Sequence, residues 1–150
     1  MASFPTNEQR REILCGQHVR LRQTIDAART AARDALVSKS ASALRIAVGM
    51  LERELLCHLD EEERLLEPIL AGIDAWGPVR LGLLRAEHAH QRAVLAILTG
   101  QSAWPFPTIV AGRTLALCDD LITDMEFEER ELLNEKLLRD DCILLDASDA

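Results

Sequence analysis

The sequence predicts an all-α protein, an up-down-up-down antiparallel four-helix bundle that forms a single domain over residues 1–150. Hydrophobic residues make up 48% of the chain but aromatic residues only 3%, a composition that favours helices. Four segments, each of roughly 20 to 30 residues, repeat apolar residues in steps of three and four, the spacing of one helix face. The connections between them are short, and no stretch alternates in the manner of a strand.

The first helix is expected over about residues 7–36. Thr6 and Gln9, three residues apart, make a capping box at its start, and the polar segment 38–42 ends it. One face of this helix carries Leu14, His18, Leu21, Ile25 and Ala28. The second helix is expected over about residues 42–71, with Pro68 near its end.

The third helix is expected to begin near Pro78, because proline suits a first turn. One face of it carries Leu81, Leu84, His88, Gln91, Leu95 and Leu98. A break with two prolines, residues 99–107, precedes the fourth helix, expected over about residues 108–138. The bundle therefore spans about residues 7–138, and the tail, residues 139–150, caps the bundle or frays.

Polar residues interrupt the apolar face of the second helix at His58 and Glu62. These residues lie four apart, so both side chains stand on the face that Leu55 and Leu65 direct toward the core. Burial of a lone carboxylate costs several kcal/mol unless a positive partner is present. An arginine, the histidine itself or a metal ion would meet that need.

An internal repeat extends this pattern to all four helices. A shift of 66 residues aligns His58 with Asp124 and Glu62 with Glu128, and a shift of 70 aligns His18 with His88. The chain thus reads as two helical hairpins related by a pseudo-twofold axis. The polar residues that converge in the interior are His18, His58, Glu62, His88, Asp124 and Glu128.

These six groups are predicted to ligate metal, because without a cation they would be very costly to bury. Three imidazoles and three carboxylates suit iron, manganese or zinc, and helical bundles host two-metal carboxylate sites. His90 is the alternative to His88 on the third helix; the two point about 200° apart, so both cannot face one site. His88 is preferred because Glu87-His88 matches Gln17-His18.

Other polar and sulfur-containing residues have simpler interpretations. Asp60, Glu61 and Glu63 are expected on a solvated acidic face, and Arg64 and Arg130 in surface ion pairs with residues four positions away. The four cysteines are widely spaced and form no CxxC pair, so they are expected to be small core residues: Cys15, Cys57, Cys118 and Cys142.

These motifs resemble the hemerythrin-like (HHE cation-binding) domain family over about residues 8–138. The matching pieces are Gln17-His18, the HxxxEE and LLxP motifs within residues 58–68, Glu87-His88, and the acidic pair Glu128-Glu129. The resemblance implies a four-helix bundle with a non-haem di-iron centre, in which the glutamate of each HxxxE motif bridges two irons.

Two positions depart from the family pattern. Asp124 stands where the family has a histidine, and Arg92 where oxygen-carrying members have a second histidine on the third helix. A carboxylate-rich centre stabilises ferric iron, whereas reversible oxygen binding needs a stable diferrous state. The predicted function is therefore reaction with or sensing of O₂, peroxide or NO, or iron handling, rather than oxygen transport.

Two alternatives remain open: a mononuclear or other-metal site, and a degenerate metal-free bundle that serves as a protein interaction module. The sequence contains no nucleophile–base pair and no phosphate loop, so it leaves open whether the protein is an enzyme. Small diatomic ligands fit a narrow Leu-lined bundle better than an organic substrate.

Charge and hydropathy limit the kinds of partner that the protein is expected to bind. The net charge of −8 argues against nucleic acid and against an anionic membrane, both of which attract basic surfaces. No apolar run approaches the roughly 20 residues that span a bilayer, and the first residues lack a signal peptide's apolar core, so a cytoplasmic location is expected. A protein partner or a homo-oligomer would contact the loop at Trp104-Pro105-Phe106 or the apolar tail.

Overall fold

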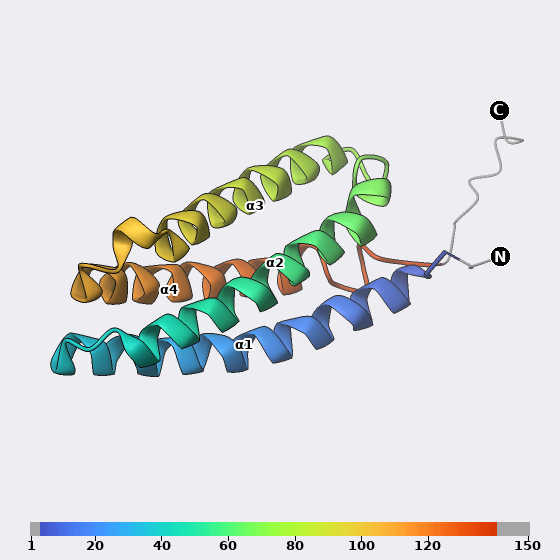
Figure 1. Cartoon of the computed structure of the whole chain (residues 1–150). Helices are drawn as coiled ribbons and strands as arrows, with labels where there is room; N and C mark the ends of the chain where they lie inside the picture. Colours follow the sequence, from blue (N-terminus) through green and yellow to red (C-terminus); the bar gives the residue numbers. More distant parts are fainter. Residues whose placement is uncertain (1–3, 141–150) are drawn as a thin grey trace, which may run out of the picture.

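The protein is a bundle of four long helices that run up and down alternately (Figure 1). The computed structural model describes residues 4–140, and within that range it contains no strand. The helices are α1 (Asn7–Ser38), α2 (Ser42–Leu70), α3 (Gly77–Thr99) and α4 (Pro107–Glu131), with a short 3₁₀ helix, η1 (Gln101–Ala103), before α4. The predicted fold class is confirmed.

The first turn of α1 is capped by residues from both the N-terminal and the C-terminal part of the chain. The predicted capping box is present: the Thr6 hydroxyl accepts from the backbone of Gln9, and the Gln9 side chain accepts from the backbone of Thr6. The carboxylate of Asp140 also accepts hydrogen bonds from the backbone N–H groups of Asn7 and Glu8, at 2.7 and 3.0 Å. These N–H groups have no partner within the helix, so Asp140 caps α1. The rest of the predicted tail, residues 141–150, lies outside the described residues.

The connection from α2 to α3 requires glycine at the first residue of α3. A Cβ atom on Gly77 would meet the carbonyl oxygen of Leu70 and lie 2.6 Å from that of Ala71. A side chain is therefore excluded where the end of α2 approaches α3. Pro68 lies inside the last turns of α2, as expected.

The predicted end of the fourth helix is wrong: α4 ends at Glu131, not near residue 138. The backbone N–H groups of both Leu132 and Leu133 donate to the carbonyl of Glu128, at 2.8 and 2.7 Å, which breaks the helical ladder. A turn then buries Leu132, Leu133 and Leu138 together, although a continuous helix would point the adjacent leucines about 100° apart.

The prediction of four core cysteines is also wrong in part. Cys118 is buried, and burial raises the pKa of its thiol to about 11. Cys15 is half-buried, Cys57 is exposed, and Cys142 lies outside the described residues. Cys57 precedes an inward-facing residue, His58, and adjacent helical residues face different directions.

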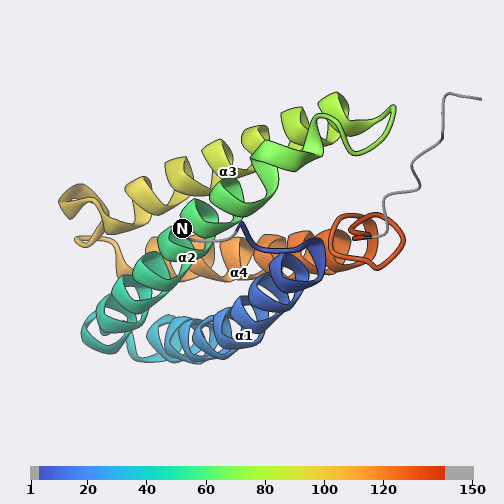
Figure 2. The same ribbon diagram turned by 90° about the vertical axis from the view of Figure 1, so that its right-hand side faces the viewer.

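Two apolar clusters fill the bundle on either side of a polar layer. The larger one extends from Leu21 and Leu55 toward the α1–α2 turn, and the smaller one, around Leu14 and Leu65, lies toward the chain termini. Helices α3 and α4 lie close together near η1 and diverge toward the other end of the bundle (Figures 1 and 2). No helix of the described residues is both long and apolar enough to cross a membrane.

Candidate metal centre

The polar layer contains side chains from all four helices. The structure brings five of the six predicted ligands into the interior, with 0–5% of each exposed: His18, His58, Glu62, His88 and Glu128. Asp124, one turn before Glu128, is half-buried. His90 is exposed, whereas His88 is buried, so of the two histidines on this helix only His88 lies in the polar layer.

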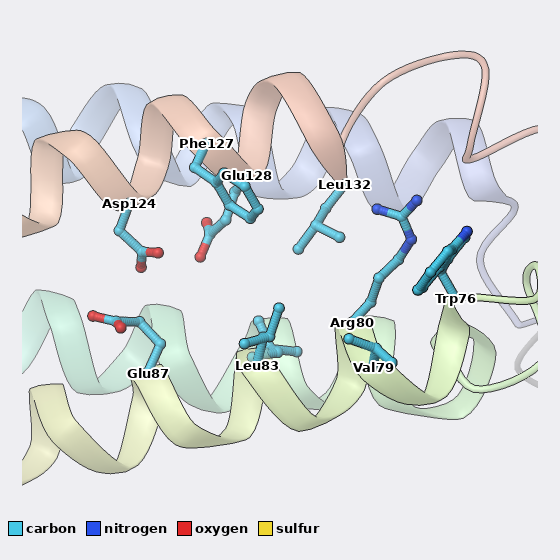
Figure 3. Close-up of a pocket in the computed structure, with 10 residues that line it drawn as sticks. Trp76, Val79, Arg80, Leu83, Glu87, Asp124, Phe127, Glu128 and Leu132 are labelled. Atoms are coloured by element: carbon cyan, nitrogen blue, oxygen red, sulfur yellow. The ribbon is translucent and has the colours of Figure 1, made fainter.

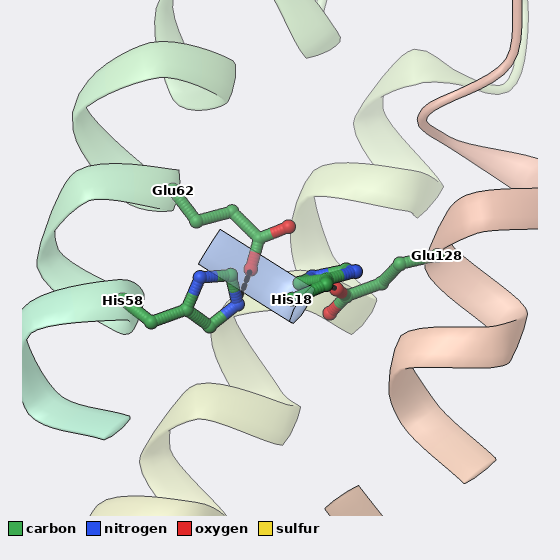
Figure 4. Close-up of side chains that lie close together, drawn as sticks. All are labelled: His18, His58, Glu62 and Glu128. Carbon is green, nitrogen blue, oxygen red and sulfur yellow. Dashed lines mark ion pairs between the residues drawn. The ribbon is translucent and has the colours of Figure 1, made fainter. Parts of the chain in front are cut away.

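The inward atoms of four of the predicted ligands lie close together, and these four residues are drawn in Figure 4: His18, His58, Glu62 and Glu128. The Nε2 atom of His18 lies 3.1 Å from Oε2 of Glu128. The Nε2 atoms of His88 and His58 lie 3.1 and 3.5 Å from the same oxygen, Oε2 of Glu62. One donor atom from each of four residues lies within 4.8 Å of the others: His18, His58, Glu62 and Glu128.

Three of the inward atoms are buried and have no hydrogen-bond partner: Nε2 of His18, Oε1 of Glu62 and Oε2 of Glu128. His18 Nε2 and Glu128 Oε2 are close enough to bond, but their geometry is not that of a hydrogen bond. A buried polar atom without a partner costs about 1–3 kcal/mol, and more when it is charged. A cation among these donor atoms would satisfy all three, so the residues fit a metal ion.

The outer nitrogen of each buried histidine is held by a hydrogen bond. Nδ1 of His18 bonds Glu129 at 2.9 Å, Nδ1 of His88 bonds Glu63 at 2.8 Å, and Nδ1 of His58 bonds the Gln17 side chain at 2.9 Å. In a neutral imidazole whose Nδ1 donates to such an oxygen acceptor, Nε2 has a lone pair that can bind a metal ion in the interior. Such outer bonds fix the ring orientation of metal-binding histidines.

Two arginines hold these outer carboxylates in turn. Arg22 donates to Glu129 at 2.7 and 3.0 Å, and Arg92 donates to Glu63 at 2.6 and 3.2 Å. The bonds from the guanidinium groups are the main cause of the lowered pKa values of both carboxyls. The expectation that Glu63 only faces solvent is therefore wrong.

The sequence did contain a signal for this outer layer. The shift of 70 that aligns His18 with His88 also aligns Arg22 with Arg92, and the shift of 66 aligns Glu63 with Glu129. The pseudo-twofold repeat thus includes the groups that orient the histidines as well as the histidines themselves.

Burial and neighbouring charges lower the pKa of one residue of the layer and raise the pKa values of three others. Burial lowers the pKa of His58 to about 3, helped by His18 and His88. Burial acts the same way on His18 and His88, but their carboxylate partners outweigh it and raise both pKa values. Burial, and then the charge of Glu62, raises the pKa of Glu128 to about 7. His58 is thus a neutral imidazole whose Nε2 is available as a ligand.

Asp124 has a different environment from the histidine that it matches. The Gln91 amide donates to Asp124 at 2.7 Å and to Glu87 at 3.4 Å. Burial, and then the charge of Glu128, raises the pKa of Asp124 to about 7, while the Gln91 bond lowers it. Gln91 is itself 2% exposed, so this amide is a buried donor placed between two carboxyls.

No arginine or lysine within residues 4–140 forms an ion pair with Glu62 or Glu128. Arg64 pairs with Glu61 and Arg130 with Glu131 on the surface. Surface ion pairs are therefore confirmed, but the expected spacing of four residues is wrong, since the partners lie three residues and one residue away. The positive charge that two buried glutamates require therefore does not come from a neighbouring arginine or lysine.

Comparison with known proteins gives one match. The family described as the hemerythrin HHE cation-binding domain matches residues 10–137. No curated protein and no solved structure matches the chain.

Proposed function

Because the chain belongs to the hemerythrin HHE cation-binding family, we propose that its buried histidine–carboxylate layer holds two non-haem iron ions. The observation that carries this proposal is the set of three buried donor atoms without a hydrogen-bond partner, on His18, Glu62 and Glu128. Mixed imidazole and carboxylate donors also suit manganese and zinc, so these metals are the alternatives.

The pseudo-twofold repeat suggests how the donors would divide between two ions. His18 and His58 would serve one ion, and His88 with Asp124 the other. Glu62 and Glu128 would lie between them, since Glu62 contacts His58 and His88, and Glu128 contacts His18 of the other half. The four terminal ligands would then be three imidazoles and one carboxylate.

Iron held here would supply redox chemistry toward O₂, peroxide or NO, or would itself be the cargo of an iron-handling protein. The role of the chain would be to orient the ligands and to cover the layer along the bundle axis. Glu129, Gln17 and Glu63 hold the three imidazoles, and apolar clusters close both sides of the layer. Asp124 adds negative charge, which favours ferric iron and argues against reversible oxygen transport.

The position of Gln91 is evidence against the alternative in which Asp124 marks a metal site that has lost its function. Under the shift of 70 residues Gln91 corresponds to Leu21, an apolar core residue. The Gln91 amide occupies a buried position where the other half has a leucine. It bonds Asp124, the one proposed terminal ligand that is not a histidine. A metal-free interaction module would not require an oriented Asp124.

A mononuclear site is the second candidate, because the four donor atoms that converge most closely exclude His88 and Asp124. Metal content distinguishes the two. With two ions, elemental analysis of protein purified without chelator gives about two irons per chain, and Asp124→Ala lowers this to about one. With one ion, the wild type gives about one iron and Asp124→Ala changes nothing.

Glu128→Ala tests both candidates, since it removes a carboxylate common to them and should abolish stoichiometric binding. Glu61→Ala is its control, because Glu61 bonds only Arg64 on the surface. No metal in the wild type after anaerobic loading with ferrous iron would refute the proposal.

A further inference from the structure

A cavity of about 530 Å³ opens between α3 and α4 and reaches the proposed metal centre (Figure 3). Trp76 and Arg80 lie at one end of it, and Glu87, Asp124 and Glu128 at the other. The helices diverge at this place, which leaves the space between them. Ligand sites of small organic molecules have volumes of about 300–1,000 Å³, so the cavity exceeds what a diatomic ligand needs.

The walls between the two ends are apolar and open to solvent. The large apolar side chains that line this stretch are unusually exposed: Trp76 67%, Val79 53%, Leu83 59% and Phe127 42%. Removal of apolar surface from water contributes about 25 cal/mol per Å², and these exposed side chains do not gain that stabilisation. A ligand with an apolar body would cover this surface.

Part of the apolar lining belongs to one half of the pseudo-twofold repeat only. Under the shifts of 70 and 66 residues, Trp76 and Phe127 correspond to Thr6 and Glu61. The register is valid at these positions, because α1 begins at Asn7 and α3 at Gly77, also 70 residues apart. Val79 likewise corresponds to Gln9, whereas Leu83 and Leu84 correspond to Ile13 and Leu14. The apolar lining at Trp76, Val79 and Phe127 is therefore particular to this half of the bundle.

Arg80 gives the outer end of the cavity a positive charge with spare hydrogen-bonding capacity. Its Nε is buried without a partner. Its other contacts are long: 3.3 Å to Asp74 and 3.4 Å to the carbonyl of Glu131. A guanidinium group prefers a carboxylate that accepts two parallel bonds. The carboxyls at the inner end would repel such an anion, so its head is directed to Arg80.

We propose that this cavity binds an amphipathic organic acid, with its carboxylate on Arg80 and its alkyl or aryl body along Leu83 and Phe127. The far end of the ligand lies beside Asp124 and Glu128. Its position next to a metal rests on the proposed function, whereas its binding to the cavity does not. The protein would thus act on, or sense, a molecule larger than O₂ or NO.

Decanoate is the probe, and Trp76 reports its binding. Trp104, the other tryptophan, is changed to Phe so that Trp76 alone fluoresces. Titration of the metal-free Trp104→Phe protein with decanoate should give a saturable change in Trp76 fluorescence. Decylamine, which has the same chain but the opposite charge, should bind at least roughly tenfold more weakly.

Two pairs of variants locate the site. Arg80→Gln should weaken decanoate at least roughly tenfold, and Arg20→Gln, an exposed arginine on α1, should not. Leu83→Gln should weaken decanoate, whereas Ile46→Gln, 67% exposed on α2, should leave binding unchanged. All four positions are partly or fully exposed, and circular dichroism checks that each variant remains helical.

Several results would overturn the proposal: no saturable binding, tighter binding of decylamine, or equal effects of Leu83→Gln and Ile46→Gln. Sedimentation that shows a dimer dissociated by Leu83→Gln would assign the surface to a second copy of the chain instead. In iron-loaded protein, decanoate should also perturb the iron absorption spectrum. Binding without that perturbation would refute the contact with the metal, whereas absence of iron would refute only the proposed function.

Discussion

Replacement of Gln91 by leucine tests whether Asp124 is a metal ligand that Gln91 orients. Leucine is the residue at the matching position, Leu21, so the change makes the two halves of the bundle more alike. It removes the 2.7 Å hydrogen bond to Asp124 and leaves Glu87 and Asp124 without the amide between them. Since that bond lowers the pKa of Asp124, its loss raises this pKa further.

The expected loss can be estimated from the bond. A hydrogen bond to a charged group contributes about 1.5–3 kcal/mol. Loss of a group that orients a metal ligand typically costs about 10- to 100-fold in metal affinity, equivalent to about 1.4–2.8 kcal/mol. The two estimates agree, so Gln91→Leu should weaken one of the two ions by about 10- to 100-fold and leave the other nearly unchanged.

The assay is a titration of metal-free protein with ferrous iron under anaerobic conditions, fitted to two sites. A triple variant serves as the rescue: Asp124→His, Gln91→Leu and Glu87→Gln together reproduce the His58, Leu21 and Gln17 environment of the first half. It should bind two irons, whereas Gln91→Leu alone binds the second ion weakly. Equal affinities for wild type and Gln91→Leu would refute a ligand role for Asp124.

Three further predictions concern the outer bonds, the pH dependence and the backbone. Glu129→Gln should weaken metal binding about tenfold, because it removes the charged acceptor of His18 Nδ1, whereas Glu61→Gln should have no effect in the same titration. The metal-free protein should lose stability as the pH rises from about 6.5 to 8.5, because Asp124 and Glu128, with raised pKa values of about 7, release protons in the folded state that the unfolded chain has already lost. His18 and His88, whose pKa values are also raised, change in the same direction, and a melting temperature that increases over this range would contradict the prediction. Gly77→Ala should lower the unfolding free energy strongly, because its Cβ would collide with the carbonyl groups at the end of α2, whereas Gly82→Ala, with open space around it, should raise stability by about 0.5–1 kcal/mol in chemical denaturation.

The sequence could predict the helices and the inward residues because both follow from helical periodicity. His18, His58, Glu62, His88 and Glu128 stay in phase with leucines of their own helices, and burial follows from that phase. Asp124 is also in phase, but it lies where α3 and α4 diverge and is therefore only half-buried.

The features that the sequence did not predict depend on contacts between helices. Nothing within α2 alone indicates that Glu63 reaches across to His88 on α3, and the run of acids around it suggests a solvated face. The end of α4 depends likewise on a turn that buries Leu132 and Leu133 against other helices. The cavity between α3 and α4 arises from the angle between two helices, which periodicity does not determine.

Three departures from pseudo-twofold symmetry occur together on one side of the proposed metal centre. Around His58 the second helix meets a glutamine and a leucine, Gln17 and Leu21, and the helices pack closely. Around Asp124 the matching residues are Glu87 and Gln91, and beyond them the bundle opens into an apolar cavity. Because the histidine-to-aspartate change, the buried amide and the cavity coincide, we interpret them as one adaptation of the proposed function: each half would hold an ion, and the half at Asp124 would also admit the molecule that reacts or is sensed. Drift in a decayed bundle would scatter such changes over both halves.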